Sequence, residues 1–515
     1  MTNNIRSLLP RGRQQLSHLK TLDKRVAVIG GGLAGLAAAC CLTQHGCDVS
    51  LYEKNESTGG RARHFDHKGF VFDMGPSWYW MPEVMEQFFN RFGQSVSNYF
   101  NLVRLDPSYR IFFHDGPLDV PASRVELDAL FESLEPGSSP SLKKFLAEAK
   151  RKYDTGMGKF VWKPSLGVAE YLSWELLGES FRLDLLSSVS SHVQKYFRNE
   201  KIIQLLEFPV LFLGAKPSKT PALYTMMNYA DMELGTWYPM GGMCQLPIAM
   251  TKLAEELGVT IHCNSPIEKI LTSGRKANGL LVNGNEISFD VVVATADYHH
   301  VESSLLYKES RTYSDEYWSK RVMSPSCLIY YVGVNKKVDG LLHHNLFFDQ
   351  PFAPHGHAIY DQPSWPDNPQ FYVCCPSKTD ASVAPSEMEN LFILIPLAPG
   401  LASNESLREK LFEKAISRIE LLTGSTFMNN IVYKKSYAHE EFISDYNAFM
   451  GNAYGLANTL RQTAFLKPRM QSKKISNLFF AGQLTVPGPG VPPAIISGQI
   501  AARIAAEYAS GLKHS

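Results

Sequence analysis

The chain has 515 residues, which is long enough to bury a large core and favours two or three domains. Apolar residues make up 44% of it and charged residues 20%, as in ordinary globular domains. The formal net charge of +1 excludes a general electrostatic attraction to nucleic acid or to anionic substrates.

A basic arm, residues 1–23, opens the chain. It has no apolar run of the kind found in secretion signals, and no later run is long enough to cross a bilayer, so we expect neither a leader nor a membrane span. We interpret the arm as a solvated segment in preference to an anchor on a membrane surface. The basic residues of the arm and of the two positions after it are Arg6, Arg11, Arg13, Lys20, Lys24 and Arg25.

Residues 25–53 have the pattern of a strand, a turn, a helix and a second strand. The apolar run at 25–29 predicts the first strand, an Ala- and Leu-rich stretch at 36–45 predicts the helix, and 48–53 predicts the second strand. The turn between them reads GGGLAG, residues 30–35. A glycine motif that opens a helix directly after a strand is typical of a dinucleotide-binding unit.

Each position of this motif has a separate role. Gly30 makes the tight turn, Gly32 lets the backbone approach a pyrophosphate, and Gly35 lets the helix pack on the strand. The helix N-terminus then directs its partial positive charge at the phosphates.

Two features farther along identify the dinucleotide. Glu53 lies 18 residues after Gly35, at the end of the second strand, where an acid binds both ribose hydroxyls and disfavours a 2′-phosphate. Gly59-Gly60-Arg61 then adds a second glycine turn and a guanidinium whose fixed fork of donors suits phosphate oxygens. Ordinary NAD dehydrogenases have no need of this addition, so the pattern favours FAD.

Later segments supply the rest of a parallel α/β domain. A helix and a strand follow Gly241, three short runs between 267 and 289 alternate like an antiparallel meander, and 290–296 predicts a buried strand. A last strand, at 477–482, precedes the final helix. We therefore predict a Rossmann-like α/β domain that binds FAD and comprises residues 24–115, 238–305 and 470–515.

The remaining segments are rich in aromatic residues and mix helix and strand patterns, and the chain has no internal repeats. The simplest arrangement is a second, mixed α+β domain that is inserted in two halves and holds the substrate. This predicted substrate domain comprises residues 116–237 and 306–469.

Near the end of the chain, residues 481–502 read AGQLTVPGPGVPPAIISGQIAA. Pro492 and Pro493 suit the first turn of a helix, where no N–H is required. The stiff approach sets the angle at which the helix N-terminus, with its partial positive charge, meets the rest of the molecule. We interpret the segment as part of the cofactor site and not as a rigid loop alone.

Together, the GxGxxG motif, Glu53, the GGR turn and this tail resemble the carotenoid desaturases, a family of FAD-dependent, amine oxidase-like flavoproteins, and in particular the bacterial phytoene desaturases. Three stretches between head and tail agree: FDMGPSWYWMPEV at 72–84, PALYTMMNYADMELGTWYPMGGM at 221–243 and YGLANTLRQTAFLKP at 454–468. The resemblance covers nearly the whole chain after about residue 24. It implies FAD as cofactor and a hydrocarbon substrate such as phytoene, taken towards lycopene in several rounds.

The resemblance also assigns the C-terminal segment to the flavin. It implies that Gly482 and Gln483 lie near the ribityl chain and the pyrophosphate, although many relatives have an acid in place of Gln483, and that residues 491–494 pass beside the isoalloxazine. The last helix would direct its N-terminus at the pyrimidine side of the ring, where reduction leaves negative charge, and stabilise that charge by about 0.3–2 kcal/mol. The full set expected to contact FAD is Gly30, Gly32, Leu33, Ala34, Gly35, Glu53, Gly59, Gly60, Arg61, Ile267, Gly482, Gln483, Val491, Pro492 and Ala494.

A hydrocarbon substrate constrains the chemistry. No carbonyl acidifies its C–H bonds, so we expect loss of a hydride from an allylic carbon to flavin N5, followed by loss of a proton from the neighbouring carbon. Such a site needs a dry apolar tunnel, aromatic faces that tolerate positive charge, and one weak base. The candidate aromatic residues are Trp78, Tyr79, Trp80 and Trp237, and the candidate bases, none of them assigned, are Glu233, Asp231 and Glu170. In related enzymes quinone or oxygen reoxidises the FAD.

The apolar, cysteine and histidine patterns of the sequence indicate where the protein is located and whether it binds a metal. Because phytoene lies inside the bilayer, we expect peripheral attachment to the inner face of the cell membrane, with the apolar run at 202–213 and the basic arm as candidate docking segments. The eight cysteines fall in no CxxC spacing, which favours a reducing cytoplasm. No histidine spacing closes a four-ligand set, so we expect no metal site. The histidine pairs are His299-His300, His343-His344, and His355 with His357.

Four alternatives stay open at this point. In the first, the substrate is diapophytoene or a hydroxylated carotene. In the second, the reaction is carotenoid isomerisation, or saturation by reduced flavin. In the third the protein is an amine oxidase, and in the fourth it is a lipid-binding relative without catalysis. The last would lack tightly bound FAD, and the intact glycine motifs argue against it.

Overall fold

A computed structural model describes residues 22–167, 170, 187–211, 214–402, 404–459 and 462–512. Nearly all of the predicted basic arm and the last two residues of the predicted docking run, 212 and 213, lie outside the described residues.

A parallel sheet of five strands carries the glycine motif. Its order is β19-β13-β1-β2-β9, and Val28 in the middle of β1 lies between Val293 of β13 and Leu51 of β2. In that order, the five strands are Leu478–Phe480, Val291–Ala294, Arg25–Ile29, Asp48–Tyr52 and Thr260–His262. Both faces are buried, as the continuous apolar runs of these strands require.

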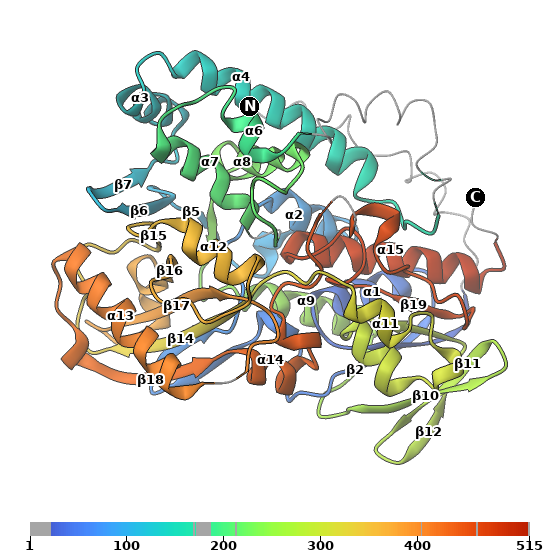
Figure 1. The fold of residues 1–515 in the computed structure, drawn as a ribbon. Coiled ribbons are helices and arrows are strands. Elements are labelled where there is room, and N and C mark those ends of the chain that lie inside the picture. The colour runs from blue at the N-terminus through green and yellow to red at the C-terminus, as the bar shows by residue number, and fades with distance from the viewer. Residues whose placement is uncertain are drawn as a thin grey trace.

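Helices cover one face of this sheet and a meander covers the other. The helices, stacked in Figure 1, are α1 (Leu33–Gln44), α15 (Val491–Ala509), α9 (Gln245–Glu256) and α2 (Pro82–Asn90). The other face packs against the antiparallel strands β10 (Ile267–Ser273), β11 (Lys276–Val282) and β12 (Asn285–Ser288) and the short helices α10 (Tyr298–His300) and α11 (Asp315–Ser319). The predicted Rossmann-like α/β fold with its meander is therefore confirmed.

One glycine brings α15 against α1. A Cβ at Gly498 would lie 2.1 Å from the carbonyl oxygen of Ala34, so the two helix backbones approach this closely only because residue 498 has no side chain. The first turn of α1 consequently packs against the second turn of α15.

The second sheet is mixed and has seven strands in the order β18-β14-β17-β16-β15-β6-β7. Their bounds are Ile431–Tyr437, Ser326–Val334, Glu389–Leu397, Phe371–Cys374, His344–Phe347, Tyr109–Phe113 and Gly116–Val120. Alternate residues of β14 face opposite sides: Tyr330 packs with α13 (Glu405–Thr423), and Cys327 and Ile329 face the centre of the molecule. The predicted boundary between residues 115 and 116 falls in the turn between β6 and β7 of this sheet.

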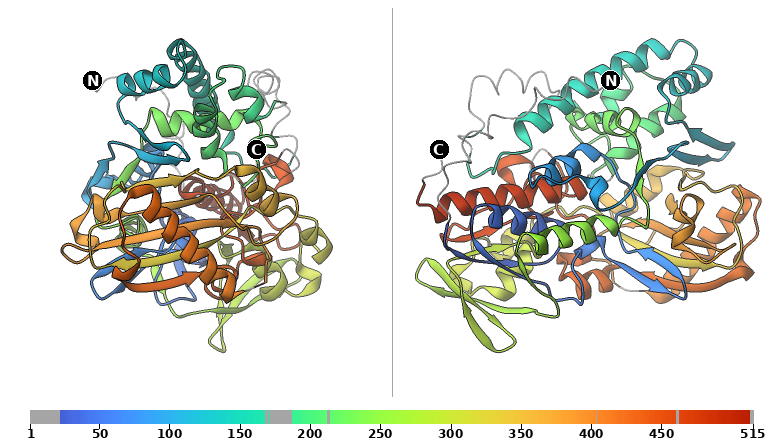
Figure 2. Two further views of the ribbon diagram at one scale, coloured as in Figure 1. Left: turned by 60° about the vertical axis from the view of Figure 1, so that its left-hand side comes forward. Right: turned by 180° about the vertical axis from the view of Figure 1, so that it is seen from behind.

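A layer of helices lies over both sheets (Figures 1 and 2). Its members are α3 (Arg124–Leu134), α4 (Ser139–Thr155), α6 (Val189–Val193), α7 (Glu200–Leu211) and α8 (Met226–Met232). Helix α7 contains most of the run expected to dock on a membrane, but Ile202, Leu205 and Phe208 are buried. This corrects the expectation for residues 202–211: the run is apolar because it packs inside the helical layer.

Small elements join these parts. The hairpin β3 (His64–His67) and β4 (Phe70–Asp73), the pair β5 (Leu102–Arg104) and β8 (Trp237–Pro239), and the helices α12 (Phe352–Tyr360) and α14 (His439–Tyr446) complete the fold. Within the part of the chain that the structure describes, no helix combines the length and the apolar character needed to cross a membrane.

Candidate cofactor and substrate site

A large cavity, about 930 Å³, lies where the two sheets and the helical layer meet. This volume is at the upper end of the range usual for small-molecule sites. Two chemically different sets of residues line it. One set is the glycine turns, Glu53, Arg61 and the C-terminal segment, and the other is apolar and includes Trp78, Trp80, Met157, Phe160, Leu223 and Met226.

The two glycine turns form a narrow gap without side chains. Gly30 has a φ of +102°, and a Cβ there would lie 2.9 Å from the Ala296 nitrogen. A Cβ at Gly35 would lie 1.9 Å from the Gly30 oxygen, so the helix packs on the turn only with glycine. Gly32 is open, and the nearest atom to a Cβ there is the Gly60 Cα at 3.9 Å. Gly32 and Gly60 thus leave bare backbone on both sides of a gap that suits a pyrophosphate.

Glu53 is buried at the end of β2 with its carboxylate fixed in place. Its Oε2 accepts the N–H of Gly31 at 2.8 Å, and its Oε1 accepts the backbone and side-chain N–H groups of Asn55 at 2.9 and 2.8 Å. Oε1 thus has both lone pairs in use, and Oε2 has one left that can accept a hydroxyl hydrogen from the cavity.

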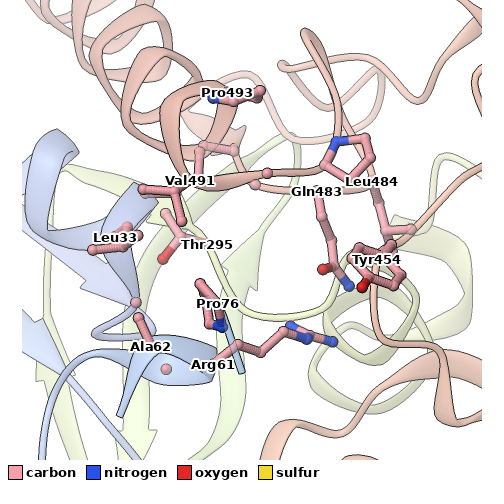
Figure 3. Close-up of a pocket in the computed structure, with 18 of the residues that line it drawn as sticks. Leu33, Arg61, Ala62, Pro76, Thr295, Tyr454, Gln483, Leu484, Val491 and Pro493 are labelled. Carbon is pink, nitrogen blue, oxygen red and sulfur yellow. The ribbon is translucent and has the colours of Figure 1, made fainter. Parts of the chain in front are cut away.

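Arg61 extends into the cavity from the turn after β2 (Figure 3). Its Nη2 donates to the backbone oxygen of Asn452 at 3.4 Å, and its buried Nε has no partner among the described residues. Burial lowers the pKa of this guanidinium, and Asp297 counteracts the shift, so it stays charged. A buried cation with an unsatisfied donor fits an anionic phosphate group.

The C-terminal segment closes the cavity from the side of α15. The N–H of Gly482 donates to Ser497 Oγ at 3.0 Å, which ties the loop to the helix behind it. Gln483 donates through Nε2 to Asn452 Oδ1 at 3.2 Å, so Asn452 holds both Gln483 and Arg61. In Figure 3, Val491 and Leu33, the first residues of α15 and α1, lie on the same side of the cavity. Two helix N-termini, each with a partial positive charge, therefore face one space.

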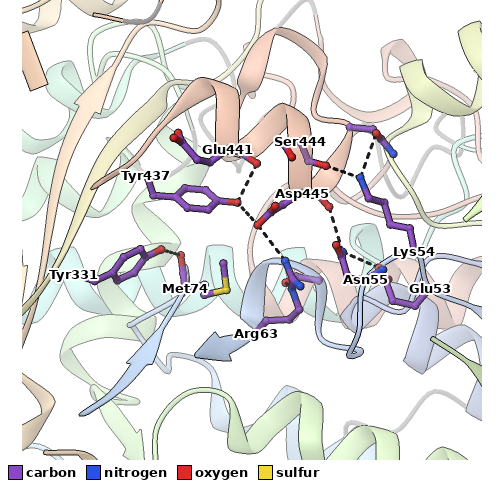
Figure 4. Close-up of polar contacts among 12 residues, drawn as sticks. Glu53, Lys54, Asn55, Arg63, Met74, Tyr331, Tyr437, Glu441, Ser444 and Asp445 are labelled. Carbon is purple, nitrogen blue, oxygen red and sulfur yellow. Dashed lines mark hydrogen bonds and ion pairs between the residues drawn. The ribbon is translucent and has the colours of Figure 1, made fainter. Parts of the chain in front are cut away.

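Helix α14 is fastened over the loop that follows β2 (Figure 4). Lys54 Nζ donates to the oxygen of Ser444 at 2.5 Å, and Asn55 Nδ2 donates to that of Asp445 at 3.2 Å. Arg63 pairs with the Asp445 carboxylate at 3.2 Å, and Tyr437 donates to the same carboxylate at 2.9 Å. We call these contacts the α14 clamp. The clamp places Asp445 and its neighbours 446 and 447 in the cavity wall.

The aromatic wall of the cavity is Trp78 and Trp80. Trp80 Nε1 donates to Thr236 Oγ1 at 2.9 Å, and Thr236 in turn donates to Asp231 at 3.3 Å. Tyr109 donates to the other oxygen of Asp231 at 2.7 Å. Burial raises the pKa of Asp231 to about 7. The network holds Trp80 in its orientation from behind.

Comparison with known proteins places the chain. It matches the family described as flavin containing amine oxidoreductase over residues 33–506. It is 43% identical over 479 residues to the carotenoid 3,4-desaturase of Haloarcula japonica, covering 92% of this chain and 96% of the relative. It is 31% identical over 488 residues to the zeta-carotene-forming phytoene desaturase of Myxococcus xanthus, covering 93% of each chain. The chain belongs to the carotenoid desaturase family of flavin-containing amine oxidoreductases.

The carotenoid desaturase family is thus the one that the sequence resemblance indicated, and the protein is a flavin-dependent oxidoreductase. A solved structure, an oxidoreductase from Methanosarcina mazei, shares its fold with a TM-score of 0.61, 17% identity and coverage of 92% of this chain and 98% of that one. The narrower resemblance to phytoene desaturases is not resolved, because the relative with 43% identity is a 3,4-desaturase by name.

Most residues expected to contact the cofactor line the large cavity of this desaturase family member. The exception is Gly35, which is buried behind the turn, where it lets α1 approach β1. Residues that meet in the cavity are Gly30, Gly32, Leu33, Ala34, Glu53, Gly59, Gly60, Arg61, Ile267, Gly482, Gln483, Val491, Pro492 and Ala494.

Two of the four expected aromatic residues lie elsewhere. Tyr79 and Trp237 are paired through their backbones, with the Trp237 N–H donating to the Tyr79 oxygen at 3.1 Å, and neither lines the cavity. Trp237 Nε1 donates to the Leu234 oxygen at 2.8 Å. Since Tyr79 stands between Trp78 and Trp80 on an extended segment, its side chain points to the opposite side.

The three candidate bases are corrected as well, because none lines the cavity. Asp231 supports the aromatic wall from behind. Glu233 pairs with Arg124 in a partly exposed position. Glu170 accepts the backbone N–H groups of residues 165–167 and so holds a loop.

Sequence reasoning missed three features of the site. The α14 clamp joins segments about 390 residues apart, and no local motif marks it. Asn458 lines the cavity, and the buried amine of Lys467 lies near it, beside Gly488, without a hydrogen-bond partner in the described chain. Burial lowers the pKa of Lys467 to about 7. The stretch 454–468 had been noted only for its resemblance.

Proposed function

We propose that the protein is an FAD-dependent desaturase of an acyclic carotenoid. The observation that carries the proposal is the cavity of about 930 Å³, in which a phosphate- and ribose-binding set meets an apolar aromatic set. Cofactor and hydrocarbon would thus share one cavity. When bound, FAD supplies the acceptor for a hydride.

Several residues would hold FAD. Glu53 would accept a ribose hydroxyl, Arg61 would pair with a phosphate, and the bare backbone at Gly32 would let the pyrophosphate approach the first turn of α1. The first turn of α15 would stabilise negative charge on the ring. The unpaired Nε of Arg61 and the glycine gap support this assignment, since both are left unfilled by the chain itself.

The apolar set has a separate task. Residues such as Phe160, Leu223 and Met226 offer no hydrogen bonds, so they would exclude water and bind a hydrocarbon chain by dispersion and burial. The faces of Trp78 and Trp80 would stabilise a transient positive charge on the substrate, because cation–π attraction strengthens in a dry site. The network behind Trp80 keeps its ring in place for that purpose.

Two substrates follow from two observations. The sequence resemblance favours phytoene as the starting material. The relative with 43% identity, a carotenoid 3,4-desaturase, favours a more oxidised carotenoid and a double bond near one end of it. In either case each turnover removes two hydrogens.

We propose that the substrate enters from a membrane at residues 463–466. These residues line the cavity, yet Phe465 is 37% and Leu466 42% exposed, so an apolar rim stands at the surface. Peripheral attachment at this rim would let a carotenoid pass from the bilayer into the cavity without crossing water. Changing both residues to Ser should abolish binding to liposomes, and unchanged binding would refute this entry site.

The test of the function is expression in two bacterial hosts, one accumulating phytoene and one accumulating lycopene, with mass analysis of the pigments. Products lighter than phytoene by eight hydrogens would identify a four-step phytoene desaturase. A product lighter than lycopene by two hydrogens would identify a terminal desaturase. Unchanged pigments in both hosts, from protein that carries FAD, would contradict the proposal. A matched host with the Arg61→Met variant controls for background oxidation.

A further inference from the structure

Two histidines and a cysteine meet behind the aromatic wall, where β15 pairs with β16. His344 lies opposite Cys374 in the antiparallel register, and His343 precedes it. One ring nitrogen of each histidine and the Cys374 sulfur all lie within 4.8 Å of one another. The three residues are 5%, 0% and 4% exposed. Sequence spacing did not reveal this cluster because Cys374 is 30 residues away along the chain.

Both imidazoles are held through one nitrogen and leave the other free. His343 Nδ1 lies 2.8 Å from Thr379 Oγ1, and His344 Nδ1 lies 2.6 Å from the hydroxyl of Tyr372. The Nε2 atoms of both rings are buried and have no hydrogen-bond partner among the described residues. Metal-binding histidines are commonly oriented in this way, by a hydrogen bond to the nitrogen that does not bind the metal.

A small cavity of about 20 Å³ adjoins the cluster. His343 and Cys374 line it, and so does Asp73, whose carboxylate accepts the N–H groups of Met243 and Cys244 at 2.7 and 2.9 Å. A volume of this size holds about one water molecule or one ion with little else. The carboxylate also places a negative charge beside the cluster, which favours a cation.

We propose that His343, His344 and Cys374 bind one zinc ion. Two imidazole nitrogens and a thiolate form a ligand set that zinc accepts, with a water as fourth ligand. Zn–N bonds of about 2.0–2.1 Å and a Zn–S bond of about 2.3 Å put tetrahedral ligand atoms roughly 3.3–3.6 Å apart, so the cluster closes with a movement of about 1 Å. Binding replaces the thiol hydrogen of Cys374 by the metal and releases it as a proton.

The site would act on structure and not on the reaction. His344 stacks on Trp78 with ring centroids 4.1 Å apart, and Trp78 lines the large cavity. Zinc would fasten the ends of β15 and β16 directly behind this ring and so fix one side of the substrate space.

The test is metal analysis of the whole protein, purified with its flavin and without a histidine tag or chelator. We expect close to one zinc per chain, and X-ray absorption at the zinc edge should show two nitrogen neighbours and one sulfur neighbour at the distances above. Less than a fifth of an equivalent, both as purified and after dialysis against zinc and then buffer, would overturn the proposal.

Variants locate the metal. Cys374→Ser should lose the zinc. Cys375→Ser, which changes the buried thiol directly after β16 that packs in a different part of the core, should keep it. Thr379→Val, which removes the hydroxyl partner of His343, should weaken zinc binding by about 10–100-fold and leave the fold intact. If Cys374→Ser fails to fold, the X-ray absorption spectrum of the unchanged protein still shows whether a sulfur atom binds the zinc. Full zinc content in folded Cys374→Ser, or a spectrum without sulfur, would refute the assignment.

Discussion

Replacing Glu53 by Gln should weaken FAD binding sharply while leaving the fold in place. The carboxylate accepts hydrogen bonds at both oxygens, from Gly31 on one side and from Asn55 on the other. A glutamine has one acceptor oxygen, so either orientation turns its NH2 group against an N–H donor. A ribose hydroxyl would also meet a neutral amide in place of the carboxylate. The loss of that charge-assisted hydrogen bond to the cofactor costs about 1.5–3 kcal/mol, or about 10- to 150-fold in the Kd for FAD.

The assay is titration of apoprotein with FAD, followed by quenching of flavin fluorescence. Glu56→Gln is the matched control, because it removes the same charge three residues farther on from an exposed position. The thermal stability of both apoproteins shows whether the substitution acts on the turn itself. FAD binding by Glu53→Gln within twofold of the unchanged protein would refute the role given to this carboxylate, as would an equal loss of stability with and without FAD.

Three further predictions concern packing and buried charge. Gly498→Ala should force α15 away from Ala34 and lower Tm, because overpacking costs about 1–3 kcal/mol while the gain in helix propensity is only about 1 kcal/mol. The control is Gly158→Ala, at a position where an added Cβ meets nothing within 4 Å. An equal Tm for the two variants would contradict this prediction. The pKa of Asp231 is raised to about 7 in the folded protein, whereas the unfolded chain ionises near pH 4, so the stability of the fold decreases as pH rises from about 4 to about 7. Asp231→Asn should remove this decrease when Tm is measured across the same pH range. The pKa of Lys467 is lowered to about 7, so its protonation destabilises the fold most at and below neutral pH. Lys467→Met should therefore raise Tm by a few degrees at pH 6 and by less at pH 9. A rise in Tm that does not depend on pH would argue against a buried amine without a partner in the described chain.

The parts of the site that sequence reasoning could predict are those set by local backbone geometry. Gly30, Gly32 and Gly35 have steric roles that depend on a strand, a turn and a helix adjacent in sequence, and Glu53 follows at the end of the next strand. The prolines before α15 act within one turn of the same helix. For such features, spacing along the chain is nearly the same information as position in space.

Features that depend on long-range packing could not be predicted in this way. The three consecutive aromatic residues 78–80 were all expected in the substrate site, but an extended chain turns alternate side chains to opposite sides, and only the tertiary structure shows which side faces the cavity. Asp231 and Glu233 were candidate bases because of the segment they occupy. Their partners, Tyr109 and Arg124, come from distant elements that sequence could not bring to them. The domain boundary at 115 likewise divides a hairpin whose sheet forms through distant pairings.

The strands of the parallel sheet are synthesised at widely separated times, and this affects when the flavin pocket can form. Strand β1 leaves the ribosome early, but β19 and helix α15 follow about 450 residues later, a delay of roughly half a minute to a minute and a half at about 5–20 residues per second. Until then β13 remains the edge strand of an unfinished sheet, and α1 lacks its neighbour α15. The flavin pocket therefore closes only after translation ends, and a premature stop that removes the last 40 residues would yield a nearly full-length chain unable to retain its cofactor.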